Sequence, residues 1–247
     1  ISLKGFSFQL IGKNYLGEEK IYTAETNSDG IAVFGDVSPG EYTLTEVGGG
    51  LEGFLYKSQN VRVTAEKTEK VHFVNEVISA SLKLIKQDAE YAERKLAGAV
   101  FEIYKIMENG SEVEYDVMTD CGNGEYVVQD LTVGQYCVKE IRAPENYQLT
   151  SLTMSFQVTR EDHGKEIEIP SLTSGNTLKE EPQRGTLEIL KVFEKYGQVV
   201  GSIRSLQGIR FHVTGQNYDE EVMTDTEGRI LLPGLRVGKY RIEEVLD

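Results

Sequence analysis

The sequence is short of cysteine, histidine and long apolar runs, and each shortage excludes a kind of structure. Its two cysteines are Cys121 and Cys137. In a hairpin that turns near residues 130–134, Cys121 would lie about 20 Å from the point opposite Cys137. That separation is too long for a disulfide, so we expect one strand cysteine and one loop cysteine, both free. The three histidines lie apart and form no triad or metal-ligand spacing, so no metal or other cofactor is expected.

Basic residues are also scarce relative to acidic ones. The chain has 26 lysines and arginines against 40 aspartates and glutamates, a net charge of -14. Such a chain repels nucleic acid and anionic membranes, so neither is an expected partner. No apolar run approaches the ~20 residues of a spanning helix, and no signal peptide or wall-sorting signal is visible. Because the 247 residues begin and end inside repeated strands, we expect them to be an excised piece of a longer protein.

One pattern occurs three times and organises the chain. A tyrosine, an aliphatic residue and a glutamate lie at positions i, i+2 and i+4, which share one face of a β-strand. The copies are Tyr42, Leu44 and Glu46; Tyr136, Val138 and Glu140; and Tyr240, Ile242 and Glu244. The glutamates are spaced 94 and 104 residues apart, so the repeat has the size of a domain.

Each repeat reads as a series of short strands separated by turns. The runs are rich in Val, Ile, Thr, Tyr and Phe, and Asp29-Gly30 and Asn123-Gly124 are typical hairpin turns. About seven strands per repeat predict an all-β protein of small antiparallel β-sandwich domains in tandem. We expect boundaries at 1–76, 77–180 and 181–247. Only the middle repeat is expected to be complete, because the first lacks its first strand and the third lacks its last.

The glutamate of each repeat is aimed at an apolar face, where a carboxylate is costly unless it has partners. Lysine is a candidate partner, because Lys86 shares a strand face with Leu82 and Leu84, and Lys191 lies in a matching strand. Glu140 follows Lys86 by 54 residues, and Glu244 follows Lys191 by 53. The matched spacing suggests that the opposite charges meet.

Asparagine is the third component of the pattern. Asn75 lies on the inward face of the strand that closes the first repeat. In the second repeat we take residues 166–171 as the last strand, and this segment has no asparagine at the expected place. Asn176, just before the next repeat, is the best candidate there.

The chain at this point resembles a known family. It is similar to the tandem B-type repeats of bacterial collagen-binding surface proteins and to the prealbumin-like, immunoglobulin-like domains of Gram-positive pilins. The resemblance covers essentially all 247 residues. Its most specific motif resembles the family's E-box and comprises Tyr136, Val138, Glu140, Ala143, Pro144 and Tyr147.

The resemblance implies an intramolecular isopeptide bond between a first-strand lysine and a last-strand asparagine. Burial lowers a lysine pKa and raises a glutamate pKa, so a neutral amine can attack the amide while a carboxylic acid moves protons. Lys86, Glu140 and Asn176 would form one such set. Glu46 with Asn75 lacks a lysine in this chain, and Lys191 with Glu244 lacks an asparagine.

Two simpler interpretations stay open for these residues. Lys86 and Lys191 could be edge-strand lysines whose ammonium groups reach water. Lys86 and Glu140 could also form a plain buried ion pair.

The leading functional prediction is a structural stalk or pilin-like shaft on the surface of a Gram-positive bacterium, in a wall-anchored parent protein. Its partners would be the neighbouring repeats of that protein. The alternative is an adhesin module that binds a host glycan or matrix protein, although no exposed aromatic cluster stands out. An enzyme is disfavoured, since an isopeptide bond would form once per domain without turnover.

Overall fold

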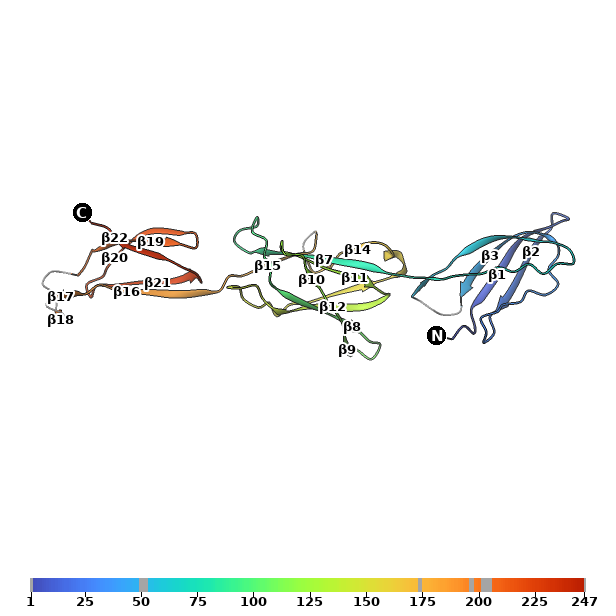
Figure 1. Ribbon diagram of the computed structural model, residues 1–247, viewed down its shortest axis with the longest axis horizontal. Helices are drawn as coiled ribbons and strands as arrows, with labels where there is room; N and C mark the ends of the chain where they lie inside the picture. Colours follow the sequence, from blue (N-terminus) through green and yellow to red (C-terminus); the bar gives the residue numbers. More distant parts are fainter. Residues whose placement is uncertain (1, 49–52, 173–174, 196–197, 201–205, 247) are drawn as a thin grey trace.

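Three blocks of β-sheet follow one another along an extended molecule, with the two termini in opposite end blocks (Figure 1). The computed structural model describes residues 2–48, 53–172, 175–195, 198–200 and 206–246. The predicted all-β fold is confirmed, because apart from one short 3₁₀ helix, Arg160–Asp162, the regular elements of these residues are strands. None of the described helices is long and apolar enough to span a membrane.

The central block is a sandwich of two sheets. One sheet has the order β10-β11-β7-β14, with β15 also paired to β7, and the other has the order β13-β12-β8-β9. The strands of the first sheet are β7 (Ala80–Asp88), β10 (Thr119–Asp120), β11 (Glu125–Leu131), β14 (Glu166–Ile167) and β15 (Thr177–Glu180). Those of the second are β8 (Val100–Ile106), β9 (Glu112–Val117), β12 (Gly134–Arg142) and β13 (Thr153–Val158).

Strand β7 shows why this block has an enclosed core. Every second residue of β7 is buried, and the buried set includes Leu82 and Leu84 at 0% exposure. Phe101 of β8 and Tyr126 of β11 pack edge to face in the same core, with ring centroids 4.9 Å apart. The alternation therefore places Lys86, two positions after Leu84, inside the sandwich rather than at its surface.

Two details of the predicted strand order are wrong. Strands β11 and β12 do not form a hairpin, because the chain crosses between sheets after Leu131, and β12 pairs with β8 and β13. Residues 166–171 are not the last strand either. Strand β15 follows them and, like β14, runs parallel to β7. The predicted free cysteines are nevertheless confirmed, with Cys137 buried on β12 and Cys121 exposed in the loop after β10.

The first block repeats the second sheet of the central block. Its four-stranded sheet has the order β2-β1-β3-β5, formed by β1 (Ser7–Asn14), β2 (Glu19–Glu25), β3 (Gly40–Gly48) and β5 (Ser58–Val63). A small pair, β4 (Phe54–Leu55) and β6 (Glu76–Val77), contacts the central block, where Arg160 donates a hydrogen bond to the carbonyl of Phe54. Tyr42 and Leu44 of β3 are buried against Leu10 of β1.

The third block contains parts of both sheets. Strands β16 (Arg184–Leu190) and β21 (Arg229–Arg236) pair in the same way as β7 and β11. Strands β19 (Arg210–Gly215), β20 (Tyr218–Met223) and β22 (Arg241–Glu244) match β8, β9 and β12. The remaining pair is β17 (Phe193–Lys195) with β18 (Gln198–Val200).

Candidate crosslinking site

Lys86 lies inside the central sandwich with no exposed surface. Its ammonium Nζ is 2.6 Å from Oε1 of Glu140 and also contacts Oε2 of Glu180. The ring of Phe101 lies beneath it, with its centroid 5.2 Å away. Burial lowers the pKa of Lys86, and the close approach of Glu140 opposes that shift only in part. The site thus favours the neutral amine more than water does.

Glu140 lies on β12, and the alternation of side chains along this strand directs it into the sandwich, as the sequence predicts. Its side chain has no exposed surface. One oxygen, Oε2, accepts a hydrogen bond of 3.0 Å from the backbone N–H of Thr150. The other, Oε1, faces Lys86 at ion-pair distance without the angles of a hydrogen bond. This carboxyl group is therefore oriented toward the lysine nitrogen, with one oxygen available for proton transfer.

Glu180 completes the group and was missed by the sequence analysis. It ends β15, where Leu178 lies opposite Lys86 and Glu180 lies opposite Asp88. Its side chain is 3% exposed and points to the same interior as Lys86. A signal for it was present in the sequence, since Asn75 precedes Lys86 by eleven positions and Glu180 precedes Lys191 by eleven.

Asn176 lies near Lys86 along the sheet, but its side chain forms hydrogen bonds with backbone groups and not with Lys86. Its Oδ1 accepts a hydrogen bond of 2.7 Å from the backbone N–H of Ile169. Its Nδ2 donates to the carbonyl oxygens of Ile167 and Lys83, at 2.7 and 3.0 Å. With φ at 52°, Asn176 adopts the left-handed conformation that asparagine tolerates. These contacts describe a residue that fixes the turn between β14 and β15.

The other predicted residues meet in pairs. In the first block, Asn75 Nδ2 donates a 3.1 Å hydrogen bond to Glu46 Oε1, and Glu46 is 2% exposed. In the third block, Lys191 Nζ lies 2.7 Å from Glu244 Oε2, and both side chains are partly exposed. The residues of each pair occupy strand positions that correspond to positions in the central block. The structure thus brings two of the three groups together in each end block.

The central site contains the kinds of group that acyl transfer to an amine needs. A lysine nitrogen, two carboxyl groups and an aromatic face are enclosed together, and none of the four residues is more than 5% exposed. Proximity of this kind removes much of the entropic cost of a bond-forming step. Among the described residues, no group of three or more His, Cys, Asp and Glu side chains could hold a metal ion.

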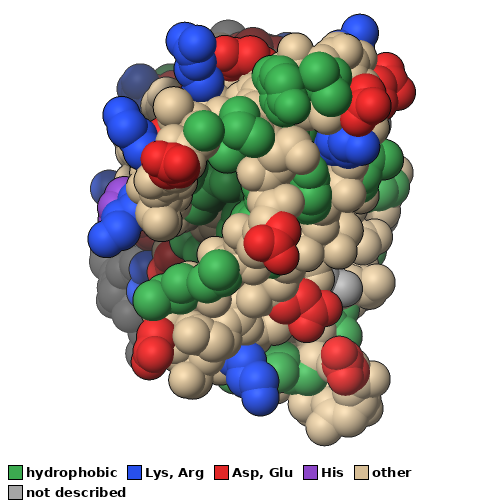
Figure 2. Space-filling view, turned by 90° about the vertical axis from the view of Figure 1, so that its right-hand side faces the viewer, with side chains coloured by type: hydrophobic (Ala, Val, Ile, Leu, Met, Phe, Trp, Pro, Cys, Tyr) green, Lys and Arg blue, Asp and Glu red, His purple; other side chains and the backbone are tan. Residues whose placement is uncertain are grey.

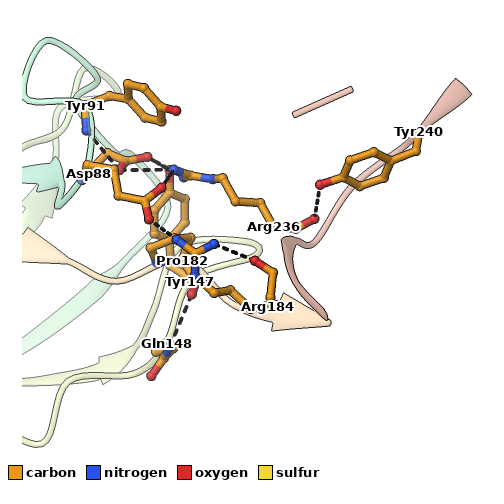
Figure 3. Close-up of polar contacts among 10 residues, drawn as sticks. Asp88, Tyr91, Tyr147, Gln148, Pro182, Arg184, Arg236 and Tyr240 are labelled. Carbon is orange, nitrogen blue, oxygen red and sulfur yellow. Dashed lines mark hydrogen bonds and ion pairs between the residues drawn. The ribbon is translucent and has the colours of Figure 1, made fainter. Parts of the chain in front are cut away.

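A second polar cluster joins the central and third blocks (Figure 3). Arg236, which ends β21, reaches into the central block, where its Nη2 lies 2.5 Å from Oδ2 of Asp88. Its Nη1 lies 2.7 Å from Oε2 of Glu90, and Tyr147 donates a 2.7 Å hydrogen bond to Asp88. Arg184 contacts Glu90 and donates a 2.6 Å hydrogen bond to the carbonyl of Gly234. We refer to Asp88, Glu90, Tyr147, Arg184 and Arg236 as the junction cluster.

The charges of the junction cluster are matched, and two of the charged side chains, Asp88 and Arg236, are buried. Burial acts to raise the pKa of Asp88, but hydrogen bonds from Arg236 and Tyr147 outweigh it and hold that pKa below its ordinary value. The same hydrogen bond to Asp88 raises the pKa of Arg236. Nothing in the repeat pattern marks this cluster, because threonine and serine occupy the positions of Arg236 in the other two blocks.

The fold and the site together define a class of protein. The three blocks share one β-sheet design, and in each of them the repeated glutamate contacts a lysine or an asparagine. The family model of the SpaA prealbumin-like fold domain matches residues 2–77 and 80–171. The chain belongs to this family and carries the domain in tandem.

One solved structure agrees with this assignment at the level of fold. The Bacillus anthracis TIE protein is 24% identical, with a TM-score of 0.67, and the match covers 100% of this chain and 43% of that chain. The 247 residues therefore span less than half the length of that protein. The streptococcal ancillary pilin is 17% identical over 99% of this chain and 84% of its own, with a TM-score of 0.38. A search of curated proteins finds no match.

Proposed function

We propose that these residues are a stalk or pilin-like segment of a bacterial surface protein, which carries load between a cell wall and a distal part. The observation that carries this proposal is the linear arrangement of sandwich blocks joined by buried polar contacts (Figure 1). Membership of a pilin-like domain family supports a structural role on the outer surface of a Gram-positive cell. Neighbouring repeats of the parent protein would be the partners.

The junctions support a load-bearing role because both are specific. At the junction with the third block, Arg236 is 9% exposed and pairs with Asp88, which has no exposed surface. At the junction with the first block, Arg160 donates a 2.6 Å hydrogen bond to the carbonyl of Phe54 and stacks 3.9 Å from the Tyr56 ring. Flexible polar linkers would make no such contacts. The blocks are thereby held in line.

The proposed source of mechanical strength is an autocatalytic isopeptide crosslink in each block. In the central block the nucleophile would be Lys86 and the acid–base Glu140. The same chemistry is proposed for Glu46 with Asn75 and for Lys191 with Glu244, where the described residues supply two of the three groups. By analogy with a disulfide, closing a loop of about 90 residues would stabilise the central block by roughly 4–5 kcal/mol.

An adhesin role is the second candidate, and exposed hydrophobic side chains on the first block favour it. Figure 2 faces this end of the molecule and shows hydrophobic side chains spread among acidic and basic ones. Tyr15 and Leu16, at the β1–β2 turn, are 73% and 64% exposed. The exposed hydrophobic side chains at this end of the molecule are interspersed with charged ones (Figure 2). The stalk is therefore the better-supported function.

Two measurements separate these functions. Small-angle X-ray scattering of the 247-residue chain should give the profile of an extended, rigid rod, and a compact or freely jointed profile would contradict the stalk. A screen against host glycans and matrix proteins should show no saturable binding. Specific binding that is lost in a Tyr15→Ala, Leu16→Ala variant would favour the adhesin.

A further inference from the structure

Glu180 occupies the position in the central block that Asn75 occupies in the first. Each residue precedes the inward lysine of the following block by eleven positions. Each also lies beside the glutamate of its own block, since Asn75 bonds Glu46 directly and Glu180 shares the Lys86 ammonium with Glu140. The place of the asparagine is therefore taken by a carboxylic acid.

We propose that Lys86 and Glu180 form an intramolecular amide bond, with Glu140 as the catalytic acid–base. This inference rests on the crosslinking function proposed above and specifies its acyl donor. The neutral Nζ of Lys86 attacks Cδ of protonated Glu180. The new Nζ–Cδ bond forms as the Cδ–OH bond breaks, and the hydroxyl leaves with one amine hydrogen as water. Glu140 gives a proton to the departing hydroxyl and takes one from nitrogen, so it ends as it began.

The burial of the three side chains supplies the protonated acid that this step needs. The side chains of Lys86 and Glu140 have no exposed surface, and that of Glu180 is 3% exposed. Two carboxylates and one ammonium would leave a net negative charge among Phe101 and other core side chains, which is costly. Retaining a proton on one carboxyl group removes that charge. Burial also lowers the pKa of Lys86, which favours the attacking amine.

Asn176 is a poorer acyl donor than Glu180. Its amide oxygen and nitrogen both bond to backbone groups of Ile169, Ile167 and Lys83, so an attack would break three hydrogen bonds. Glu180 already contacts the nucleophile, and the register of β15 on β7 holds it there. The geometry thus assigns the crosslink to the end of β15 instead of the turn before it.

Intact mass spectrometry of the denatured 247-residue chain tests the proposal. The expected result is a mass about 18 Da below the sequence mass, for loss of water, with a branched peptide joining positions 86 and 180 after digestion. An unshifted mass, which would mean a buried ion triad, overturns the proposal. So does a loss of about 17 Da with the branch at position 176, which would mean ammonia leaving from Asn176.

Variants sharpen the assignment. In Glu180→Gln the same amide forms by loss of ammonia, so the crosslinked variant and the crosslinked wild type should have equal masses. Asn176→Ala should keep the 18 Da loss, whereas Glu180→Ala and Lys86→Arg should lose it, with folding checked by circular dichroism. If a variant does not fold, the branched peptide of the wild type still shows which two residues are joined. An unshifted mass with a rod-like scattering profile would remove the amide bond but leave the stalk.

Discussion

A buried lysine between two carboxyl groups costs free energy, because charged groups lose their hydration when they are buried. Lys86 has no exposed surface, and removing its charge leaves Glu140 and Glu180 without their cation. Breaking a buried pair by removing one partner costs about 3–5 kcal/mol in other proteins. The buried charges of this site therefore have to be either paired with one another or removed by a reaction.

Substitution of Lys86 gives the first prediction at this scale. Lys86→Met should lower the free energy of unfolding of the central block by at least about 3–5 kcal/mol, because it leaves two buried carboxyl groups without a partner and also prevents the crosslink. Urea denaturation followed by tyrosine fluorescence would measure it. The matched control is Lys83→Met on the same strand, whose side chain is 36% exposed and pairs loosely with Glu166. The control should change stability by at most about 1 kcal/mol, and equal losses in both variants would contradict the account.

Glu140 gives the second prediction. Glu140→Gln keeps the shape of the side chain but removes the proton-transfer group, so any mass loss at Lys86 should be abolished or slowed by roughly 10²–10⁴-fold. Time-resolved mass spectrometry of the newly synthesised chain would follow it, because unfolding does not reopen an amide bond that has already formed. Glu112→Gln, at a partly exposed glutamate that pairs with Lys139, should react at the wild-type rate. An unchanged rate in Glu140→Gln would show that Glu140 is not the acid–base.

At the scale of strands, β7 is the element on which the central block depends. It pairs with β11 on one side and with β14 and β15 on the other, so both edges are satisfied. Its inward residues include Leu82 and Leu84, which have no exposed surface. Leu82→Ala should cost about 2–5 kcal/mol through the cavity it leaves. Leu152→Ala, at a 43% exposed position of the same block, should change stability by about 0.5 kcal/mol or less, and urea midpoints would compare the two.

Strand-level features also show how far the sequence could be read. Period-two alternation and the repeated glutamate strand predicted the all-β class and the meeting of Lys86 with Glu140. The sequence did not reveal β15, because Thr177–Glu180 is short and follows a turn set by Asn176 in a left-handed conformation. Without β15, Glu180 had no assigned place. The crossing from β11 to β12 was also missed, since a short loop fits a hairpin as readily as a change of sheet.

At the scale of the whole molecule, the junction cluster sets how the blocks move. Arg236→Ala should leave Asp88 buried with only Tyr147 as a side-chain donor and loosen the third block. Faster hydrogen exchange at residues 88–91 and a broader scattering profile are expected. Arg241→Ala, at an exposed arginine that pairs with Glu243, is the control and should change neither. Unchanged exchange in Arg236→Ala would show that the cluster does not fix the junction.

Acid should loosen the same junction. Because the pKa of Asp88 is lower in the folded chain, its contribution to stability is fully present above the ordinary value of 3.8 and is lost as the pH falls through the folded value. Scattering at pH 7 and at pH 3 or below should therefore show a rigid and then a flexible junction. In Asp88→Asn the profile should already be flexible at pH 7. A wild-type junction that stays rigid well below pH 3 would contradict this role of Asp88.

Stretching the chain between its termini is the measurement that tests the central claim most directly. A crosslink from Lys86 to β15 would keep the residues between positions 86 and 180 from extending. At ~3.3–3.6 Å per residue, this lowers the contour length released on unfolding by about 300 Å. Single-molecule force spectroscopy should therefore show wild type releasing about 300 Å less than Glu140→Ala. Equal contour lengths for the two chains would mean that the central block bears load through hydrogen bonds alone.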